Sequence, residues 1–511
     1  MPSRALSLAL TLLCSAPALA LAQNGALKRA AETITEADVA RRIGVIAHDS
    51  MGGRATGSPG LLKTARWVAG EFRRFGLKPG GDSGTFLQTY HISRKRVLAE
   101  RSTVTFSQTD GGAGMNATLA EGAAWIGGAT RTTARGPLVL MGGALDPAGI
   151  KAADVAGRVV VLILPADNTS PRSYRAMLGG LASAGAVAVA AVTPSDSLFA
   201  RMKAGGPPIV TVVGDGPGMA AIGVLERTVT TQVPEAGATF AQIRQAPTMV
   251  VAPYPDWEGV LSIQDTTIST LASQNTVGIL EGSDPALRGE YLVFSAHMDH
   301  VGTTGRPMAA CRAQGADSIC NGADDDASGT VGVVELAEAL SRPDARPRRS
   351  MIFLTVSGEE QGLWGSAWFA DHPGVPLDRI VANINLDMIG RNWTDTIAVI
   401  GKEHSDLGAT LNRVNAAHPE LRMTAVDDLW PQERFYFRSD HFNFARKGVP
   451  ILFFFNGVHP DYHRVSDSPE KIDAEKEARI LRLIYYLGQE VANAAERPKW
   501  VPESYRQIVQ P

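Results

Sequence analysis

The residues best suited to chemistry are acids and histidines that follow apolar runs in the C-terminal half of the chain. The runs include YLVFSA, MIFLTV and IVANINL. The acids and histidines are His297 and Asp299 in SAHMDH, Asp325 in NGADDDASG, Glu359 and Glu360 in SGEEQG, Asp387 in NLDMIG, and His463 in DYHRVSD. Open α/β sheets bind their ligands at the carboxyl ends of the strands, so we expect these side chains to meet at one sheet edge. Carboxylates and imidazoles gathered there are what a divalent-metal hydrolase needs.

Some of these motifs have a second interpretation when each is taken alone. NGADDDASG also loosely fits the ligand positions of a calcium-binding loop. Those positions would be Asp324, Asp326, Ser328, Gly329 and Glu335. The preceding CRAQGADSICNGA is a poor entering helix, however, and Ser328-Gly329 looks like the start of the helix TVGVVELAEAL. The HEXXH motif is absent, which excludes the zincin arrangement.

The elements that must position these residues alternate between strand and helix from about residue 275 onward. The strands are continuous apolar runs rather than alternating ones, which is typical of a parallel sheet with helices on both faces. We therefore predict an α/β fold with a mostly parallel, helix-covered central sheet. Nearer the N-terminus, residues 35–75 are predicted to be helical, with a start at Thr35 and an end at Gly76.

The composition changes between about residues 110 and 255. This stretch is rich in Gly, Ala, Val and Thr, and it contains short strands such as PLVLM and RVVVLIL. One helix, YRAMLGGLASAGA, precedes the strand VAVAAV. We predict a small β-rich insert with one helix.

The N-terminal residues 1–22 are a predicted secretory signal. Arg4 supplies a positive start, Ala5 to Leu21 is apolar, and a small-x-small site precedes Gln23. An uncleaved anchor is the alternative, but the stretch is short for a membrane span and contains Pro17. The formal net charge of −3, without a basic block, gives no basis for binding nucleic acid or an anionic membrane. We expect a secreted or periplasmic protein with no membrane attachment after cleavage.

Two cysteines, Cys311 and Cys320, remain after removal of the signal. In an oxidising compartment we expect them to close a short loop as a disulfide, with two free thiols as the alternative. Neither is expected to bind zinc, because no CxxC or paired-histidine spacing accompanies them.

Together the motifs resemble the secreted co-catalytic di-zinc aminopeptidases and the related glutamate carboxypeptidases of metallopeptidase family twenty-eight. The resemblance runs from GGRATGSPGLLKTARWVAGEFRRFGLKP through YLVFSAHMDHVG to DYHRVSD, and the middle resembles the protease-associated domain often inserted in these enzymes. It implies a zinc-dependent exopeptidase domain in two parts around that insert. The implied bounds are 23–109 and 256–496 for the peptidase domain, 110–255 for the insert and 497–511 for a C-terminal tail.

The resemblance also implies two Zn²⁺ ions. The implied ligands are His297 and Asp387 for one ion, Glu360 and His463 for the other, and Asp325 as the bridge. The peptide bond from Asp325 to Asp326 is expected to be cis.

The remaining implied roles concern catalysis. Glu359 would be the general base, Asp299 would orient His297, and Tyr462 would hydrogen-bond the developing oxyanion. The implied activity is removal of N-terminal residues from peptides with a free N-terminus. SDHFNF, residues 439–444, is either a wall of the specificity pocket or a capped helix that packs its aromatic residues.

Three other functions fit the sequence less well. A carboxypeptidase or dipeptidase of the same fold would need a basic residue for a substrate carboxylate, and Arg434 and Arg438 are the candidates. Glutaminyl cyclisation is disfavoured because that branch works with one zinc ion. A non-catalytic binding protein is disfavoured because no ligand is missing.

Overall fold

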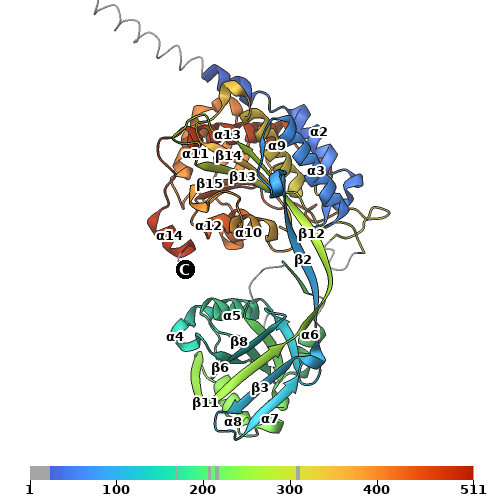
Figure 1. Ribbon diagram of the computed structural model, residues 1–511, viewed down its shortest axis with the longest axis vertical. Coiled ribbons are helices and arrows are strands. Elements are labelled where there is room, and N and C mark those ends of the chain that lie inside the picture. Colours follow the sequence, from blue (N-terminus) through green and yellow to red (C-terminus); the bar gives the residue numbers. More distant parts are fainter. Residues whose placement is uncertain (1–23, 167–170, 205–208, 213–217, 306–310, 510–511) are drawn as a thin grey trace, which may run out of the picture. The chain divides into compact units, whose positions relative to one another are not determined.

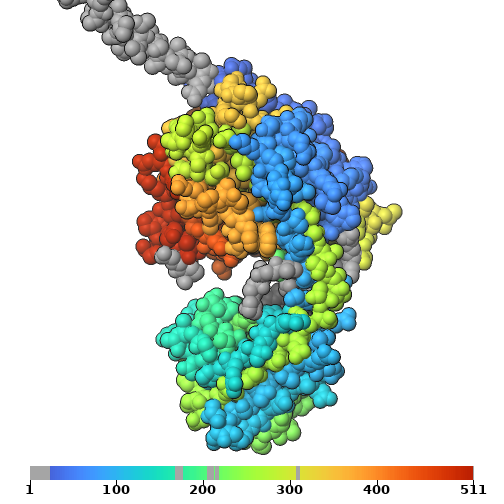
Figure 2. All heavy atoms as spheres, in the orientation of Figure 1, coloured from blue at the N-terminus to red at the C-terminus, as the bar shows by residue number. Residues whose placement is uncertain are grey.

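The described chain forms two compact units. A computed structural model describes residues 24–509, with gaps at 167–170, 205–208, 213–217 and 306–310. The predicted signal, 1–22, lies outside the described residues. One unit comprises the chain up to Tyr90 and from Ala272 onward, and the other is His91–Leu271. The chain passes between them along β2 (Leu87–Val97) and β12 (Asp265–Leu280) (Figure 1). Within each unit the described atoms are closely packed (Figure 2). Within the described ranges, no helix is long and apolar enough to cross a membrane.

The first unit is built on a mixed sheet with parallel strands at its centre. Its order is β17-β16-β18-β15-β13-β14-β12-β2, and β1 pairs with β12. The neighbours β18, β15, β13 and β14 run parallel, while β16 and β12 flank them in antiparallel orientation. The prediction of a mostly parallel central sheet is confirmed. The strand bounds are Lys78–Pro79 (β1), Tyr291–His297 (β13), Ser350–Val356 (β14), Ile380–Leu386 (β15), Thr396–Ile400 (β16), Thr424–Val426 (β17) and Ile451–Phe454 (β18).

Helices cover both faces of this sheet (Figure 1). Successive residues Val293 and Phe294 of β13 are both fully buried, against opposite helical layers. A strand buried on both faces is apolar at every position, which is why the sequence shows continuous runs. One layer consists of α2 (Glu36–Ile46), α3 (Pro59–Arg74), α9 (Gly329–Leu340), α11 (Leu407–Ala417) and α13 (Ala474–Asn493). The other consists of α10 (Trp364–Asp371), α12 (His441–Ala445) and α14 (Pro502–Ile508). The last of these lies in the predicted tail.

The predicted helical region 35–75 contains two helices, α2 and α3. The Thr35 hydroxyl caps α2 by accepting a hydrogen bond from the backbone N–H of Asp38 at 3.1 Å. The Ser58 hydroxyl caps α3 in the same way. Between the helices, Gly52 and Gly53 adopt positive φ values of 58° and 64°, which a glycine adopts without strain. A tight turn therefore replaces the middle of the predicted helical stretch.

The second unit contains a sheet of eight strands with the order β4-β3-β11-β6-β7-β8-β10-β5. The strands β6, β7, β8 and β10 run parallel. Strand bounds are Thr103–Gln108 (β3), Gly114–Thr118 (β4), Ala123–Gly127 (β5), Thr132–Gly142 (β6), Val159–Ile163 (β7), Ala188–Thr193 (β8), Ala220–Leu225 (β10) and Val250–Ile263 (β11). A further strand, β9 (Ile209–Val212), pairs with β2.

This unit differs from the predicted insert in extent and in helix content. It reaches beyond 110–255 at both ends, because β3 pairs with the last part of β11, where Thr103 lies opposite Ser262. The prediction of one helix was wrong. The described helices are α4 (Ala152–Val155), α5 (Pro171–Ser183), α6 (Asp196–Ala204), α7 (Glu226–Gln232) and α8 (Ala236–Arg244). Apart from α5 they are too short to show a helical period in the sequence. The identity of the unit as a protease-associated domain stays a prediction.

The expected disulfide between Cys311 and Cys320 is present. Both cysteines are buried and cluster with Val301 and Val465. The disulfide therefore closes a loop in the segment after β13. It packs against Val465, which lies two residues after His463.

Candidate metal centre

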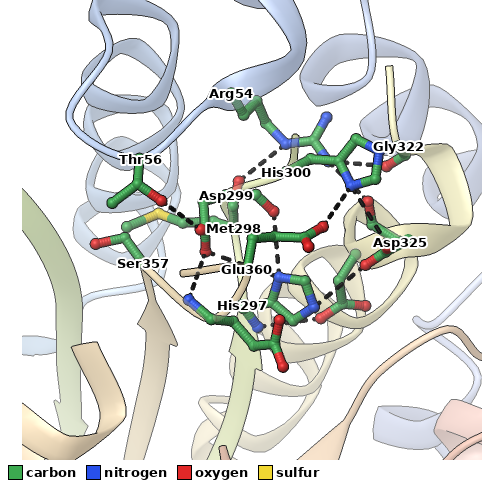
Figure 3. A network of polar contacts seen from close by, with 12 residues as sticks. Arg54, Thr56, His297, Met298, Asp299, His300, Gly322, Asp325, Ser357 and Glu360 are labelled. Carbon is green, nitrogen blue, oxygen red and sulfur yellow. Dashed lines mark hydrogen bonds and ion pairs between the residues drawn. The ribbon is translucent and has the colours of Figure 1, made fainter. Parts of the chain in front are cut away.

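The predicted ligands meet at the carboxyl edge of the parallel strands, and Figure 3 shows three of them, His297, Asp325 and Glu360. His297 is the last residue of β13, and Asp387 directly follows β15. Glu360 follows β14 after a turn in which Gly358 has a φ of 77°. The remaining two lie in turns: Asp325 before α9 and His463 after β18.

Three side chains form the first ligand group. Nε2 of His297 lies 3.3 Å from Oδ1 of Asp325 and 3.5 Å from Oδ1 of Asp387. The other oxygen of Asp387 accepts a hydrogen bond of 2.9 Å from the Ser439 hydroxyl. Ser439 therefore orients a predicted ligand, and the 439–444 segment contributes to the site as well as beginning the short helix α12.

The second ligand group shares Asp325 with the first. Nε2 of His463 lies 3.2 Å from Oδ2 of Asp325 and 3.0 Å from Oε2 of Glu360. A second imidazole also reaches this group: Nδ1 of His300 lies 3.0 Å from Oε1 of Glu360 and 3.5 Å from Oδ2 of Asp325. His300 is the last residue of the SAHMDH motif, and no role was predicted for it from the sequence.

These distances fit ligands that share metal ions. Two ligands held about 2.0–2.1 Å from a tetrahedral zinc ion lie about 3.3–3.4 Å apart, close to the separations in both groups. Several of the atoms are also buried without a hydrogen-bond partner among the described residues. They are His300 Nδ1, Asp325 Oδ2, Glu360 Oε1 and His463 Nε2. Buried polar atoms of this kind need a partner, and a cation between them supplies one.

Only the middle of three adjacent aspartates faces both ligand groups. The Asp326 carboxylate accepts from the backbone N–H groups of His297, Gly329 and Met388. Asp324 turns the other way, where Oδ1 accepts from the N–H of Gly390 at 2.7 Å. The peptide bond between Asp325 and Asp326 is cis, as the resemblance implied.

The calcium-loop interpretation is wrong. Its last position, Glu335, lies on α9 and faces away toward an ion pair with Arg42, at 2.5 Å between Oε1 and Nη1. The segment before α9 contains no entering helix among the described residues.

The resemblance implied that Asp299 orients His297, and the oxygen of Asp299 nearest to the ring is the main-chain one. Nδ1 of His297 lies 3.1 Å from the carbonyl oxygen of Asp299 and 3.8 Å from the carboxylate. The carboxylate instead accepts from the Thr56 hydroxyl at 2.7 Å and from the backbone N–H of Glu359 at 3.3 Å. Asp299 therefore contacts His297 through its carbonyl oxygen and the backbone of the predicted base, Glu359, through its carboxylate.

The predicted base and the predicted oxyanion donor both line one pocket. Burial raises the pKa of Glu359 well above its ordinary value. The Tyr462 ring stacks on His463 with 3.8 Å between centroids. The pocket is lined by His297, Asp325, Glu359, Asp387, Met388, Phe435, Arg438, Ser439, Phe453, Phe455, Val458 and Tyr462.

The charge balance of the site favours bound cations. Burial disfavours a charged His297, but nearby carboxylates, chiefly that of Asp387, raise its pKa well above the ordinary value. In the same way Asp325 and Glu360 overcome burial and raise the pKa of His463 to about 10. The surrounding imidazoles lower the pKa of Asp325 despite its burial. The carboxylates thus hold positive charge in place, and metal ions would supply that charge.

The sequence reasoning missed a buried arginine above the site. Arg54 is fully buried, and its guanidinium donates to the carbonyl oxygens of Met298 at 2.9 Å and Gly322 at 2.8 Å (Figure 3). Together with Thr56 it comes from the turn between α2 and α3. The GGRATG segment contributed to the resemblance but not to any predicted role for Arg54. Its two adjacent glycines before Arg54 are the feature of the sequence that indicates a turn with positive φ angles.

A peptidase family model matches part of the chain. Residues 275–488 match peptidase family M28. The chain carries a peptidase family M28 domain. All predicted metal ligands lie inside the matched range. The M28 domain therefore supplies the ligand edge of the sheet described above.

Similar proteins cover parts of the chain. A probable zinc metalloprotease of Leptosphaeria maculans is 39% identical over 159 residues, which are 26% of this chain and 36% of that protein. Leupeptin-inactivating enzyme 1 of Streptomyces exfoliatus is 26% identical over 213 residues, 41% of each protein. The chain thus spans well under half the length of these curated relatives.

Two solved structures are similar over more of the chain. The aminopeptidase from Aneurinibacillus sp. strain AM-1 aligns with a TM-score of 0.48 and 19% identity, over 91% of this chain and 96% of that one. BSAP, a zinc aminopeptidase from Bacillus subtilis, aligns with a TM-score of 0.46 and 18% identity over the same shares.

Proposed function

We propose that the protein is a secreted or periplasmic aminopeptidase that uses two zinc ions to remove N-terminal residues from peptides. One observation carries this proposal: the carboxylate of Asp325 presents one oxygen to each ligand group. Oδ1 lies 3.3 Å from Nε2 of His297, and Oδ2 lies 3.2 Å from Nε2 of His463. A carboxylate placed in this way can bridge a pair of metal ions. Secretion rests on the predicted signal at 1–22.

The ligand set suits zinc. The first ion would be held by His297, Asp325 and Asp387, and the second by Asp325, Glu360 and His463. Mixed imidazole and carboxylate ligands are typical of zinc sites. When bound, the two ions lower the pKa of a shared water molecule and polarise the scissile carbonyl group.

The protein's own groups would move the protons. Glu359 lines the pocket beside His297, and burial makes its carboxylate a stronger base than an exposed one. It would take a proton from the attacking water and return it to the leaving amine. The Tyr462 hydroxyl would donate to the carbonyl oxygen as that oxygen gains negative charge.

The pocket supports a substrate with an apolar N-terminal residue. Its apolar lining consists mainly of Met388, Phe435, Phe453, Phe455 and Val458. Such a lining suits an apolar side chain, while the acids of the same pocket suit the free ammonium group of the substrate. No nucleic acid or membrane partner is proposed.

A carboxypeptidase or dipeptidase is the second candidate, because Arg438 also lines the pocket. Its guanidinium stacks over the Phe435 ring at 4.6 Å and pairs with Glu433 at 3.3 Å. A basic group at this position would have to leave Glu433 to bind a substrate carboxylate, which favours the aminopeptidase.

Mass spectrometry of one peptide offered in three forms tests the proposal. The forms are free, N-acetylated and C-amidated, each with and without a chelator. We expect stepwise loss from the N-terminus of the free and amidated forms, abolished by the chelator. Trimming from the C-terminus, or cleavage of dipeptides alone, would replace the proposal with the second candidate. Absence of metal-dependent cleavage of every form would refute both.

A further inference from the structure

The turn that carries Glu359 is held by side chains of two neighbouring strands, β2 and β12. The turn begins at Ser357, directly after β14, and Tyr90 of β2 donates a hydrogen bond to it. Ser273 and Asn275 of β12 contact the same residue. Ser357 and its three partners are all completely buried. Hydrogen bonds between groups that water does not reach are costly to leave unmade, so these contacts hold the turn firmly.

Three hydroxyl groups form a chain of hydrogen bonds at this turn. Oγ of Ser273 lies 2.9 Å from Oγ of Ser357, which in turn lies 3.1 Å from Oη of Tyr90. The Tyr90 hydroxyl donates to the carbonyl oxygen of Ser357 at 3.0 Å. Since a carbonyl oxygen only accepts and each hydroxyl has one proton, Ser357 Oγ donates to Tyr90 and accepts from Ser273. The Tyr90 hydroxyl therefore binds both the carbonyl group and the side chain of Ser357.

Asn275 binds the two ends of the turn. Its Oδ1 accepts from the backbone N–H of Ser357 at 3.1 Å, and its Nδ2 donates to the carbonyl oxygen of Gly365 at 2.8 Å. The backbone N–H of Gly365 also donates to the carbonyl oxygen of Ser357 at 2.8 Å. A Cβ atom at Gly365 would lie 2.3 Å from Oδ1 of Asn275, so the absent side chain makes room for the amide. The turn from Ser357 to Gly365 is thus closed on itself and attached to β12.

The direction of Glu359 depends on these contacts because its neighbour is a glycine. Gly358 separates Ser357 from Glu359 and has a φ of 77°. A glycine has no side chain to restrict its backbone, so local sterics do not fix the direction of the next residue. On the other side, the backbone N–H of Glu359 donates to the Asp299 carboxylate at 3.3 Å, which is long for a hydrogen bond. The firm attachment of the turn is therefore the one at Ser357.

We propose that Tyr90 and Ser273 are positioning residues for the base: they hold Ser357, and through it the Glu359 carboxylate, in the geometry that proton transfer needs. The proposal rests on the proposed function, because it needs Glu359 to act as the base. A displacement of about 1 Å at a reacting group can cost about 100-fold in rate. Both residues lie where the chain leaves and re-enters the first unit, which ends at Tyr90 and resumes at Ala272. The base is thus held by the two chain segments that lead into the second unit (Figure 1).

Tyr90→Phe tests the proposal, because it removes the hydroxyl group and keeps the ring. The kinetics of the zinc-loaded wild type and variant are measured on an amidated tripeptide with an apolar first residue. We expect kcat to fall by about tenfold or more with KM unchanged and two zinc ions retained, since the lost contact positions the base and not the substrate. Ser273→Ala should lower kcat by about threefold or more, because the Ser357 hydroxyl loses its donor.

Tyr485→Phe is the matched control for the loss of a buried hydroxyl group. Tyr485 is also completely buried, and its hydroxyl oxygen accepts a hydrogen bond from Nε2 of Gln489 at 3.2 Å within α13. We expect this variant to lose resistance to urea as Tyr90→Phe does, but to keep the kcat of the wild type. Equal values of kcat in the two variants would mean that Tyr90 has a structural role only and would overturn the proposal.

Combination with Glu359→Gln shows whether Tyr90 acts through the base. Once the base is absent, its position no longer matters, so Tyr90→Phe should change the residual turnover of Glu359→Gln by less than about twofold. The same fold loss from Tyr90→Phe in both backgrounds would overturn the positioning role.

The outcomes separate the two proposals. A wild-type kcat in Tyr90→Phe would overturn the positioning role and leave the proposed function intact. Loss of zinc from Tyr90→Phe would do the same, since the effect would then act through the ligand Glu360. If the wild-type protein releases no N-terminal residue, the proposed function fails, and the positioning role with it.

Discussion

Arg54 donates to the main-chain carbonyl of Asp325, at 3.5 Å, and not to its carboxylate. The other donors of this guanidinium also bind carbonyl oxygens, including those of Ile46 and Asn321. A buried cation without a carboxylate partner is unusual, because burial disfavours its charge. Here the carbonyl dipoles bind it, and burial lowers its pKa although the nearby acids of the site act in the opposite direction. Arg54 therefore ties the end of β13 to the turn that carries the bridging ligand, and it leaves the carboxylate free for metal.

Arg54→Lys should show that the shape of the guanidinium matters as well as its charge. Lysine keeps the charge but has three donors on one nitrogen, so at least two carbonyl groups lose their partner. We expect the free energy of unfolding to fall by about 2–4 kcal/mol and the zinc affinity to fall with it. Urea unfolding and zinc titration measure the two effects. Arg41→Lys is the control: Arg41 is exposed and, among the described residues, forms its ion pair with Asp38, so its change should stay within about 0.5 kcal/mol. An equally small effect at Arg54 would contradict this account.

Glu359→Gln should separate catalysis from metal binding. Glutamine keeps the size of the side chain but cannot take a proton, so turnover should fall by about 10²- to 10⁴-fold while two zinc ions remain. Glu360→Gln is the matched change one residue later, and it should instead reduce zinc content, because it removes a ligand of the second group. Steady-state kinetics together with zinc content by mass spectrometry distinguish the two variants. Near-normal turnover in Glu359→Gln would remove its assignment as the base.

The positions of the ligands could be predicted from the sequence because the end of a strand can be recognised from the residues around it. His297 and Asp387 each end or follow a continuous apolar run, and parallel strands bring such ends to one edge whatever the loops do. The choice of Asp325 among three adjacent aspartates came from the resemblance alone. The structure explains it by hydrogen bonds: backbone N–H groups occupy Asp326 and Asp324.

The residues that the sequence did not reveal act through distant contacts. Arg54 lies more than 240 residues from Met298, and nothing around it in the sequence indicates which carbonyl groups it meets. His300 follows Asp299 directly, but its direction depends on Gly322, which only the folded turn brings beside it. The short helices of the second unit were missed because four to nine residues give too little periodicity.

Arg438→Met should leave the proposed activity largely unchanged. The Arg438 guanidinium is engaged by Glu433 and the Phe435 ring, so an aminopeptidase does not need it for binding. We expect less than about a threefold change in kcat/KM for an amidated tripeptide, since the lost exposed ion pair is weak. The same measurement on the free tripeptide is the control for a substrate carboxylate. A rise in KM of about tenfold or more for the free peptide alone would assign Arg438 to carboxylate binding and favour the second candidate function.

His441 should make the folded protein less stable at acidic pH. The residue is completely buried, Nε2 donates to the carbonyl oxygen of Tyr436 at 2.8 Å, and Nδ1 has no partner among the described residues. Burial lowers its pKa from 6.5 to about 3. Between those pH values the unfolded chain binds a proton that the folded protein does not, so stability falls as the pH drops from 6.5 toward 3. Each unit of pKa difference corresponds to about 1.4 kcal/mol.

His441→Gln isolates this contribution. The glutamine amide can keep the hydrogen bond to Tyr436 but does not titrate. The variant should be somewhat less stable than the wild type at pH 7, because it loses the ring that stacks on Phe453 at 4.3 Å. The difference should shrink by on the order of 2–4 kcal/mol as the pH falls to 4. Urea unfolding of the metal-free proteins measures it, with the exposed His91→Gln as the control. A difference between wild type and His441→Gln that does not change with pH would mean that the buried imidazole accepts its proton as readily as an exposed one.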